Sequence, residues 1–377
     1  MSQTANLKAI ACLFLKLGII GFGGPAAHIA MMQEEVVRKR NWFTEQHFLD
    51  LVGATNLIPG PNSTEMAIHI GHEKAGWKGL IVAGLCFILP AVCITGVFAW
   101  LYKEFGRIPE VKPFIYGIQP AIIAIILGAV FPLARKSIKS GELALIGVIA
   151  LILSLANMNE IFVLFGAGFL GLFLSMMKAS ANNDRHKKIL PLITLKLSAN
   201  TILTSVNGKL FFIFLKIGAI LYGSGYVLFA FLDSELVATG MLSRQELTDA
   251  IAVGQFTPGP VFSAVTFLGY QINGISGAAV STIGIFLPSF VFVALLNPLV
   301  KKMRNSTLFS SFLDAVNSAS VAIIVTICFE LGKDSISDWR TVLIGISSMG
   351  IVFGVKRVNT VFVVLGGSIA GYLLTLF

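Results

Sequence analysis

Long apolar runs separated by short polar stretches form the basic pattern of this chain. In the first half these runs cover residues 7–24, 77–102, 113–134, 143–156 and 161–177. Runs of about 20 apolar residues predict membrane-spanning helices. Segments 44–57 and 62–71 are too short to span and predict a re-entrant helical pair. The pattern therefore predicts an all-α polytopic membrane protein.

The sharpest interruptions of this pattern are Pro59-Gly60-Pro61 and Pro258-Gly259-Pro260. Proline removes a backbone donor and disfavours the helical conformation of the preceding residue, so Pro-Gly-Pro ends a helix. The second proline suits the first turn of the next helix. At membrane depth a broken helix is tolerated only inside protein or beside a watery cavity. Matching breaks in two halves of a chain therefore indicate the binding site of a secondary transporter.

The two breaks belong to an internal repeat. The segment Phe14-Leu15-Lys16-Leu17-Gly18 returns as Phe214-Leu215-Lys216-Ile217-Gly218, and Asp50 returns as Asp249. We therefore divide the chain into an N-terminal repeat (1–177), a polar and basic linker (178–209) and a C-terminal repeat (210–377). We expect about five transmembrane helices in each repeat, with one re-entrant hairpin broken at Pro-Gly-Pro. Because five is odd, the second repeat should be inverted relative to the first.

Composition and charge support a membrane location. Of the 377 residues, 55% are hydrophobic and 12% are charged, whereas soluble domains carry about 25% charged residues. The net charge of +9 does not require a nucleic-acid partner, because lysine and arginine collect on cytoplasmic loops. Most of the 28 basic residues fall on one predicted side. That assignment places the linker in the cytoplasm and both termini outside.

The candidate substrate ligands favour an anion. Lys16 and Lys216 lie within predicted spans, where a lysine is a functional-site candidate by default; snorkelling to the interface is the alternative. Helix starts after the two breaks present free N–H groups and a positive dipole end. Glycine-rich segments would let backbone approach a ligand, with close helix packing as the alternative. The further candidates in these breaks and glycine-rich segments are Asn62, Ser63, Thr64, Ser263, Gly23, Gly24, Gly223, Ser224 and Gly225.

Coupling of transport to another ion has several candidates, and the sequence does not choose among them. They are His28, Glu34, Glu35, Asp50 and Asp249, with Glu65, Asp233 and Glu235 as alternatives. The histidines at 69 and 72 fall near a helix end, where an interfacial location is favoured. No nucleotide-binding P-loop, nucleophile triad or metal-spaced cluster is present in the sequence, so we expect neither an enzyme nor a bound metal or cofactor. A homo-oligomer is an open option.

Several motifs resemble those of the chromate ion transporter family in its long, two-repeat form. They are Phe22-Gly23-Gly24-Pro25-x-Ala27-His28, Glu34-Glu35-Val36-Val37-Arg38, Arg40-Asn41-Trp42, Ile70-Gly71, Ala75-Gly76-Trp77, Gln255-x-x-Pro258-Gly259-Pro260 and Phe286-Leu287-Pro288-Ser289-Phe290, with the first Pro-Gly-Pro. The resemblance implies an inner-membrane oxyanion carrier that exports chromate. Sulfate or other oxyanion uptake by ion-coupled symport, or an anion channel, are the alternatives. The sequence departs from the family at Tyr222-Gly223-Ser224-Gly225 and at Asn56, and both departures bear on which oxyanion is preferred.

Overall fold

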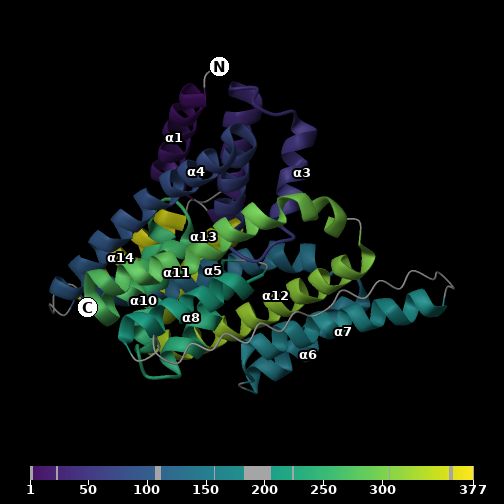
Figure 1. Ribbon diagram of the computed structural model, residues 1–377. Helices are drawn as coiled ribbons and strands as arrows, with labels where there is room; N and C mark the ends of the chain where they lie inside the picture. Colours follow the sequence, from purple (N-terminus) through teal and green to yellow (C-terminus); the bar gives the residue numbers. More distant parts are fainter. Residues whose placement is uncertain are drawn as a thin grey trace.

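The computed structural model describes residues 3–22, 24–106, 112–156, 158–181, 205–222, 225–304, 306–355 and 360–376. Every regular element in these ranges is a helix, as Figure 1 shows. Five of the helices are long and apolar enough to cross a membrane. The predicted all-α membrane class is therefore confirmed.

The helix α4 (Asn62–Phe105) is folded back on itself. Its backbone leaves the helical conformation at Ala75 and Gly76, and the φ angle of Gly76 is +61°. A Cβ atom on Gly71 would lie 2.3 Å from the carbonyl oxygen of Gly79. Eight residues along a straight helix would be about 12 Å apart, so α4 consists of a short limb and a long limb. The short limb starts at the first Pro-Gly-Pro break, and only the long limb crosses the bundle.

The helix α11 (Ala264–Arg304) repeats this hairpin after the second break. Its turn lies at Asn273 and Gly274, with φ of +59° at the glycine. The hydroxyls of Thr266 and Thr282, on the two limbs, are 2.8 Å apart. The helices that precede the breaks are α3 (Glu45–Thr55) and α10 (Arg244–Phe256), and a short 3-10 turn, η3 (Val261–Ser263), leads into α11.

The first helix of each repeat stops inside the bundle instead of crossing it. After α1 (Gln3–Ile20), the segment α2 (Gly24–Gln33) and the π-helical turn η1 (Glu34–Lys39) run back beside α1, so that Lys16 Nζ lies 2.8 Å from Glu35 Oε1. The second repeat has the same arrangement in α8 (Val206–Ile220), α9 (Val227–Leu232) and η2 (Asp233–Val237). The sequence predicted one re-entrant hairpin in each repeat, whereas the structure has two in each repeat: the pair at the Pro-Gly-Pro break and the pair formed by the first helix and its return.

The remaining helices interlock the two repeats. In the first repeat they are α5 (Lys112–Ser137), α6 (Gly141–Leu155) and α7 (Glu160–Ala181); in the second they are α12 (Thr307–Ser335), α13 (Trp339–Gly354) and α14 (Thr360–Thr375). The helix α5 packs against α13 and α14, whereas α12 packs against α6 and α7. One long helix of each repeat, α5 or α12, therefore packs against the last two helices of the other repeat.

The repeats are inverted relative to each other, as predicted. Along the long limb of α4, the Thr95 hydroxyl contacts Ser263 at 3.2 Å, and the Ala99 carbonyl accepts from Gln271 Nε2 at 2.9 Å. The short limb of α11 thus runs in the same direction as the long limb of α4. Because the long limb leads away from the α4 turn, the α11 turn lies on the opposite face of the bundle.

The described ends of the chain lie beside different helix ends. The cation–π contact between Lys74 and Trp42, at 5.1 Å, places the return of the first hairpin on the face of the α4 turn. The helix α1 begins on this face because it does not cross the bundle. At the other end of the described chain, a Cβ on Gly371 would be 2.7 Å from the Pro113 carbonyl, so α14 ends beside the start of α5. Figure 1 shows α1 and α14 in different parts of the bundle.

The predicted linker falls mostly on residues 182–204, which lie outside the described ranges. The described first half ends on the face of the α4 turn, because Lys178 pairs with Glu142 at 2.6 Å, next to the end of α5. The described second half begins with α8, which starts on the opposite face because the repeats are inverted.

Candidate functional site

Four helix interruptions meet in the interior of the bundle. The Gly60 N–H, in the first break, donates to the Leu221 carbonyl at the end of α8 with a distance of 2.8 Å. The Gly259 N–H, in the second break, donates to the Gly21 carbonyl at the end of α1 with a distance of 2.7 Å. Each Pro-Gly-Pro break is thus bonded to the first helix of the other repeat. We refer to these four interruptions together as the crossing.

Glycine is required in both breaks for reasons of backbone geometry and space. The φ angles are +132° at Gly60 and +89° at Gly259, a region that other residues rarely adopt. A Cβ on Gly259 would lie 2.9 Å from Ala91 Cβ and 3.2 Å from the Gly18 carbonyl oxygen. The flanking prolines end the preceding helices and are buried, so both breaks are enclosed in protein.

The helix starts after the breaks carry the predicted substrate ligands Asn62, Ser63, Thr64 and Ser263. Pro61 is the N-cap of α4, and its carbonyl accepts from the N–H groups of Thr64 and Glu65 at 2.8 and 3.1 Å. The first N–H groups of a helix have no partner within that helix. The side chain of Asn62 donates to Asn56 Oδ1 at 2.8 Å. Ser63, Thr64 and Ser263 are all buried. Such a set of backbone donors and hydroxyls can bind an anion.

The two helix starts contact the long limbs of the opposite repeats. Ser263 meets Thr95 of the long limb of α4, and Glu65 meets Ser289 of α11 at 3.5 Å.

Of the predicted glycine-rich ligands, Gly24 begins α2 with φ of +78°, and Gly225 packs near Val261 and Phe262. Gly23, Gly223 and Ser224 lie outside the described residues.

Lys16 and Lys216 both form ion pairs. The Lys16–Glu35 pair has an N–O distance of 2.8 Å, and the Lys216–Glu235 pair has one of 2.6 Å. The lysine side chains are 50% and 41% exposed, whereas those of the glutamates are 8% and 15% exposed. The two glutamates lie at equivalent positions of the repeat, 200 residues apart like the two lysines, so the pairing could have been predicted from the sequence. Inversion places the two pairs on opposite sides of the crossing.

The His28 side chain supports the crossing. Its Nε2 lies 2.9 Å from the Gly21 carbonyl, and its ring packs edge-on against Phe87 at 5.4 Å between centroids. Because a carbonyl only accepts, the Nε2 atom carries the proton in this contact. Glu34, another candidate for coupling, forms an exposed pair with Arg38 at 3.3 Å.

The repeated aspartates occupy different surroundings. Asp249 is buried and accepts hydrogen bonds from Tyr102 Oη at 2.6 Å and Gln119 Nε2 at 3.4 Å. It therefore links α10 to both α4 and α5. Asp50 is half-buried, with Gln46 Nε2 at 3.5 Å from its carboxylate. The sequence repeat did not predict this difference, because the partners of Asp249 come from distant helices.

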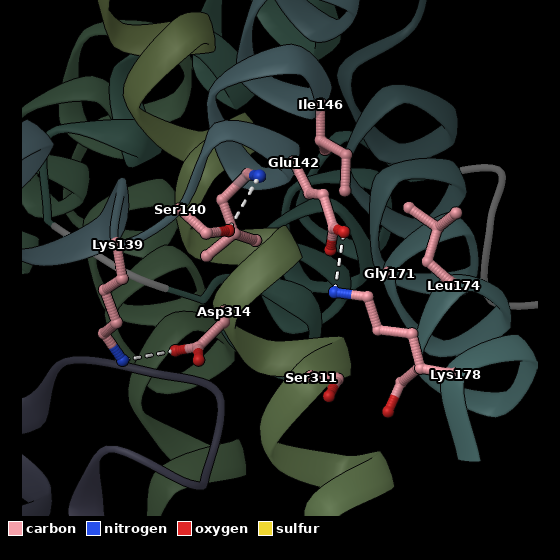
Figure 2. A pocket seen from close by; sticks show the side chains of 11 residues that line it. Lys139, Ser140, Glu142, Ile146, Gly171, Leu174, Lys178, Ser311 and Asp314 are labelled. Carbon is pink, nitrogen blue, oxygen red and sulfur yellow. Dashed lines mark hydrogen bonds and ion pairs between the residues drawn. The ribbon is translucent and has the colours of Figure 1, made fainter. Parts of the chain in front are cut away.

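Two hollows lie away from the crossing. One, of about 290 Å³, lies among α6, α7 and α12, and Figure 2 shows that the ion pairs Lys139–Asp314 and Lys178–Glu142 border it. The other, of about 470 Å³, lies beside Lys216 and Glu235. Across the residues that the structure describes, no group of three histidine, cysteine or acidic side chains could hold a metal ion.

An all-α membrane protein with two inverted repeats and paired broken helices has the architecture of a secondary transporter. The family model described as "Chromate transporter" matches the chain twice, at residues 8–172 and 208–372. The chain belongs to the chromate transporter family, and the resemblance of its motifs is confirmed.

Curated relatives agree with this assignment over nearly the whole chain. A probable chromate transport protein of Synechococcus elongatus is 30% identical over 350 residues, covering 91% of this chain and 89% of the relative. The chromate transport protein of Cupriavidus metallidurans is 28% identical over 377 residues, covering 98% and 94%. That of Pseudomonas aeruginosa is 26% identical, covering 96% and 90%. No solved structure matches the chain.

Proposed function

We propose that this protein is a secondary carrier that exports chromate, a tetrahedral dianion, across the inner membrane. The observation that carries the proposal is the reciprocal contact of Gly60 with Leu221 and of Gly259 with Gly21. It holds two helix starts inside a membrane-embedded bundle, where their N–H groups and positive dipole ends favour an anion. The names of the relatives support chromate as the substrate.

In this proposal the oxyanion binds at the helix starts of the crossing. The N–H groups of Asn62 and Ser63 supply backbone donors, and the buried hydroxyls of Ser63, Thr64 and Ser263 add side-chain donors. Charge-assisted hydrogen bonds of this kind are about twice as strong as neutral ones. The donors come from both repeats, so a relative movement of the repeats exposes the site to one face at a time.

The two Lys–Glu pairs have a role on the pathway to the crossing. Each pair is partly exposed, and one borders the hollow of about 470 Å³. We propose that an arriving oxyanion competes with Glu35 for Lys16 on one side, and with Glu235 for Lys216 on the other. Each lysine ammonium group then attracts the anion only transiently. When the anion moves on, the glutamate pairs with its lysine again.

The charge distribution supports one orientation in the membrane. Among the described residues, the face of the α4 turn carries most of the lysines and arginines, including Arg38, Lys39, Lys74 and Lys139, and basic loops face the cytoplasm. The N-terminus is then cytoplasmic and the C-terminus external. An inside-negative potential of 100 mV favours the exit of a dianion by roughly 4.6 kcal/mol, at about 2.3 kcal/mol per charge. Export therefore has a driving force without an ATPase.

Flux through purified protein in liposomes tests the proposal. Vesicles loaded with chromate are given a potassium diffusion potential of either sign, and external chromate is measured over time. An inside-negative potential should accelerate efflux, and sulfate, which has the same shape and charge, serves as the competitor. Stimulation of efflux by chromate on the far side separates a carrier from a channel. Vesicles that release no chromate above protein-free controls would contradict the proposal.

A further inference from the structure

A carboxyl group without a counter-charge lies against the first break. Glu65 is fully buried, and its Oε1 is 3.5 Å from Ser289 Oγ, at the limit of a hydrogen bond. Its Oε2 has no hydrogen-bond partner among the described residues. A Cβ on Gly60 would lie 2.3 Å from Oε1, so only glycine lets the carboxyl rest on the break.

The groups around Glu65 are polar but do not neutralise it. Ser289 faces it from α11, and Tyr222 follows Leu221, whose carbonyl accepts from the Gly60 N–H of the first break. His69 lies one turn further along the same helix. No ion pair within the described ranges includes Glu65. An isolated buried carboxylate is costly, so the proton is the simplest partner that this site can take.

The position of Glu65 links its proton to the oxyanion. Glu65 lies in the first turn of α4, next to the N–H groups of Asn62 and Ser63 that would bind the anion. A carboxylate and an oxyanion repel each other at this distance, and low dielectric strengthens the repulsion. Protonation of Glu65 therefore favours anion binding, and by linkage anion binding favours protonation.

Further titratable side chains connect this carboxyl to one face. His69 follows at four residues and His72 at seven, so they share a helix face with Glu65. His69 is fully buried, and neither ring nitrogen has a hydrogen-bond partner in the described part of the chain. Near the α4 turn, Glu73 lies 3.6 Å from His47. The row leads from the first break to the face that we assign to the cytoplasm.

The second repeat lacks this row of groups. The hairpin turns align Gly76 with Gly274, so the positions equivalent to His69 and His72 hold Phe267 and Tyr270, and residues 261–266 at the second helix start include no carboxyl side chain. A carboxyl that only stabilised the break would be expected in both copies, because the breaks have the same backbone. The asymmetry is consistent with a function that needs one titratable group for each turnover.

We infer that Glu65 takes up one proton when the oxyanion binds and releases it with the oxyanion on the other side. This inference rests on the proposed export function. Each exported dianion then carries one proton in the same direction, and one net negative charge leaves the cell. An inside-negative potential still drives this movement.

Proton and charge movements in proteoliposomes test the inference. With chromate inside, a pH-sensitive dye reports protons, and the potential at which net flux stops reports charge per chromate. Wild-type protein should move one proton and one net negative charge with each chromate. Glu65→Gln should move no proton and two negative charges. Glu104→Gln, which removes an exposed carboxyl from the far end of the same helix, is the matched control and should behave as wild type.

The outcomes separate the two proposals. Equal proton-to-chromate ratios in wild type and Glu65→Gln would overturn the role of Glu65, whereas absence of chromate flux from wild type would contradict the proposed function itself. If Glu65→Gln does not fold, proton uptake on chromate binding can still be measured with the wild-type protein alone. Weakly buffered, purified protein should take up about one proton for each chromate bound, at a pH where free chromate is the dianion. Binding without proton uptake would also overturn the inference.

Discussion

Replacing Gly259 by alanine tests the crossing directly. The residue has φ of +89°, and a left-handed conformation costs a residue with a Cβ about 1–2 kcal/mol. The new Cβ would also lie 2.9 Å from Ala91 Cβ and 3.2 Å from the Gly18 carbonyl oxygen. Crowding of this kind costs about 1–3 kcal/mol. The free energy of unfolding should therefore fall by about 2–5 kcal/mol.

Gly274→Ala, in the turn of α11, supplies a comparison without crowding. Gly274 has φ of +59° and ψ of −149°, a region largely restricted to glycine, but a Cβ at that position would meet no atom within 4 Å. A backbone cost of about 1–3 kcal/mol and no packing cost is expected there. The crowding cost of about 1–3 kcal/mol against the first repeat applies to Gly259→Ala alone.

The assay is a titration with a denaturing detergent from a mild-detergent solution, followed by circular dichroism, together with chromate flux in liposomes. Gly259→Ala should be the less stable variant and should transport more slowly, because its Cβ displaces the bond from the Gly259 N–H to the Gly21 carbonyl. A loss in Gly259→Ala no larger than its backbone cost of about 1–2 kcal/mol would show that the second break does not pack against α1 and the long limb of α4. The geometry of the crossing would then be wrong.

Three further predictions follow from the same structure. Lys16→Met and Lys216→Met should each slow chromate flux several-fold in protein that still inserts, and normal flux from the double variant would exclude both lysines from the pathway. Reporters fused before Met1 and after Phe377 should read cytoplasmic and external, respectively; finding both on one side would contradict the re-entrant path of α1. Replacing Pro59-Gly60-Pro61 by three alanines should let the helix continue and hide its first N–H groups, so chromate affinity, measured by calorimetry, should fall at least tenfold while helix content is kept.

The sequence predicted the features that have local causes. Proline and glycine determine backbone conformation at their own positions, so the breaks at 59–61 and 258–260 could be located without tertiary information. The internal repeat was visible because the motifs containing Lys16 and Lys216 keep their spacing. Inversion was predicted from five crossing helices in each repeat; the inversion is present, but the reasoning was wrong, because the first helix of each repeat stops inside the bundle.

The features that were missed depend on contacts between distant residues. An apolar run such as 7–24 has the same composition whether the helix crosses the bilayer or stops halfway, so the return of α2 was not predicted. The turn in α4 requires only Ala75 and Gly76, and an isolated glycine in a helical pattern is a weak signal. Similarly, nothing near Glu65 in the sequence indicates Ser289 as its partner.

The crossing also constrains how the carrier can move. Each break is bonded to the first helix of the other repeat, so a shift of α1 relative to the rest of the first repeat also displaces the second break. The equivalent movement of α8 displaces the first break. Inverted repeats can exchange these two arrangements, which exposes a fixed central site alternately to the two faces. The Lys16–Glu35 and Lys216–Glu235 pairs lie on opposite sides of that site, so in the proposed cycle one pair opens while the other stays closed. Symmetry of the backbone allows this proposed cycle, in which the unmatched carboxyl of Glu65 would carry a single proton per turnover.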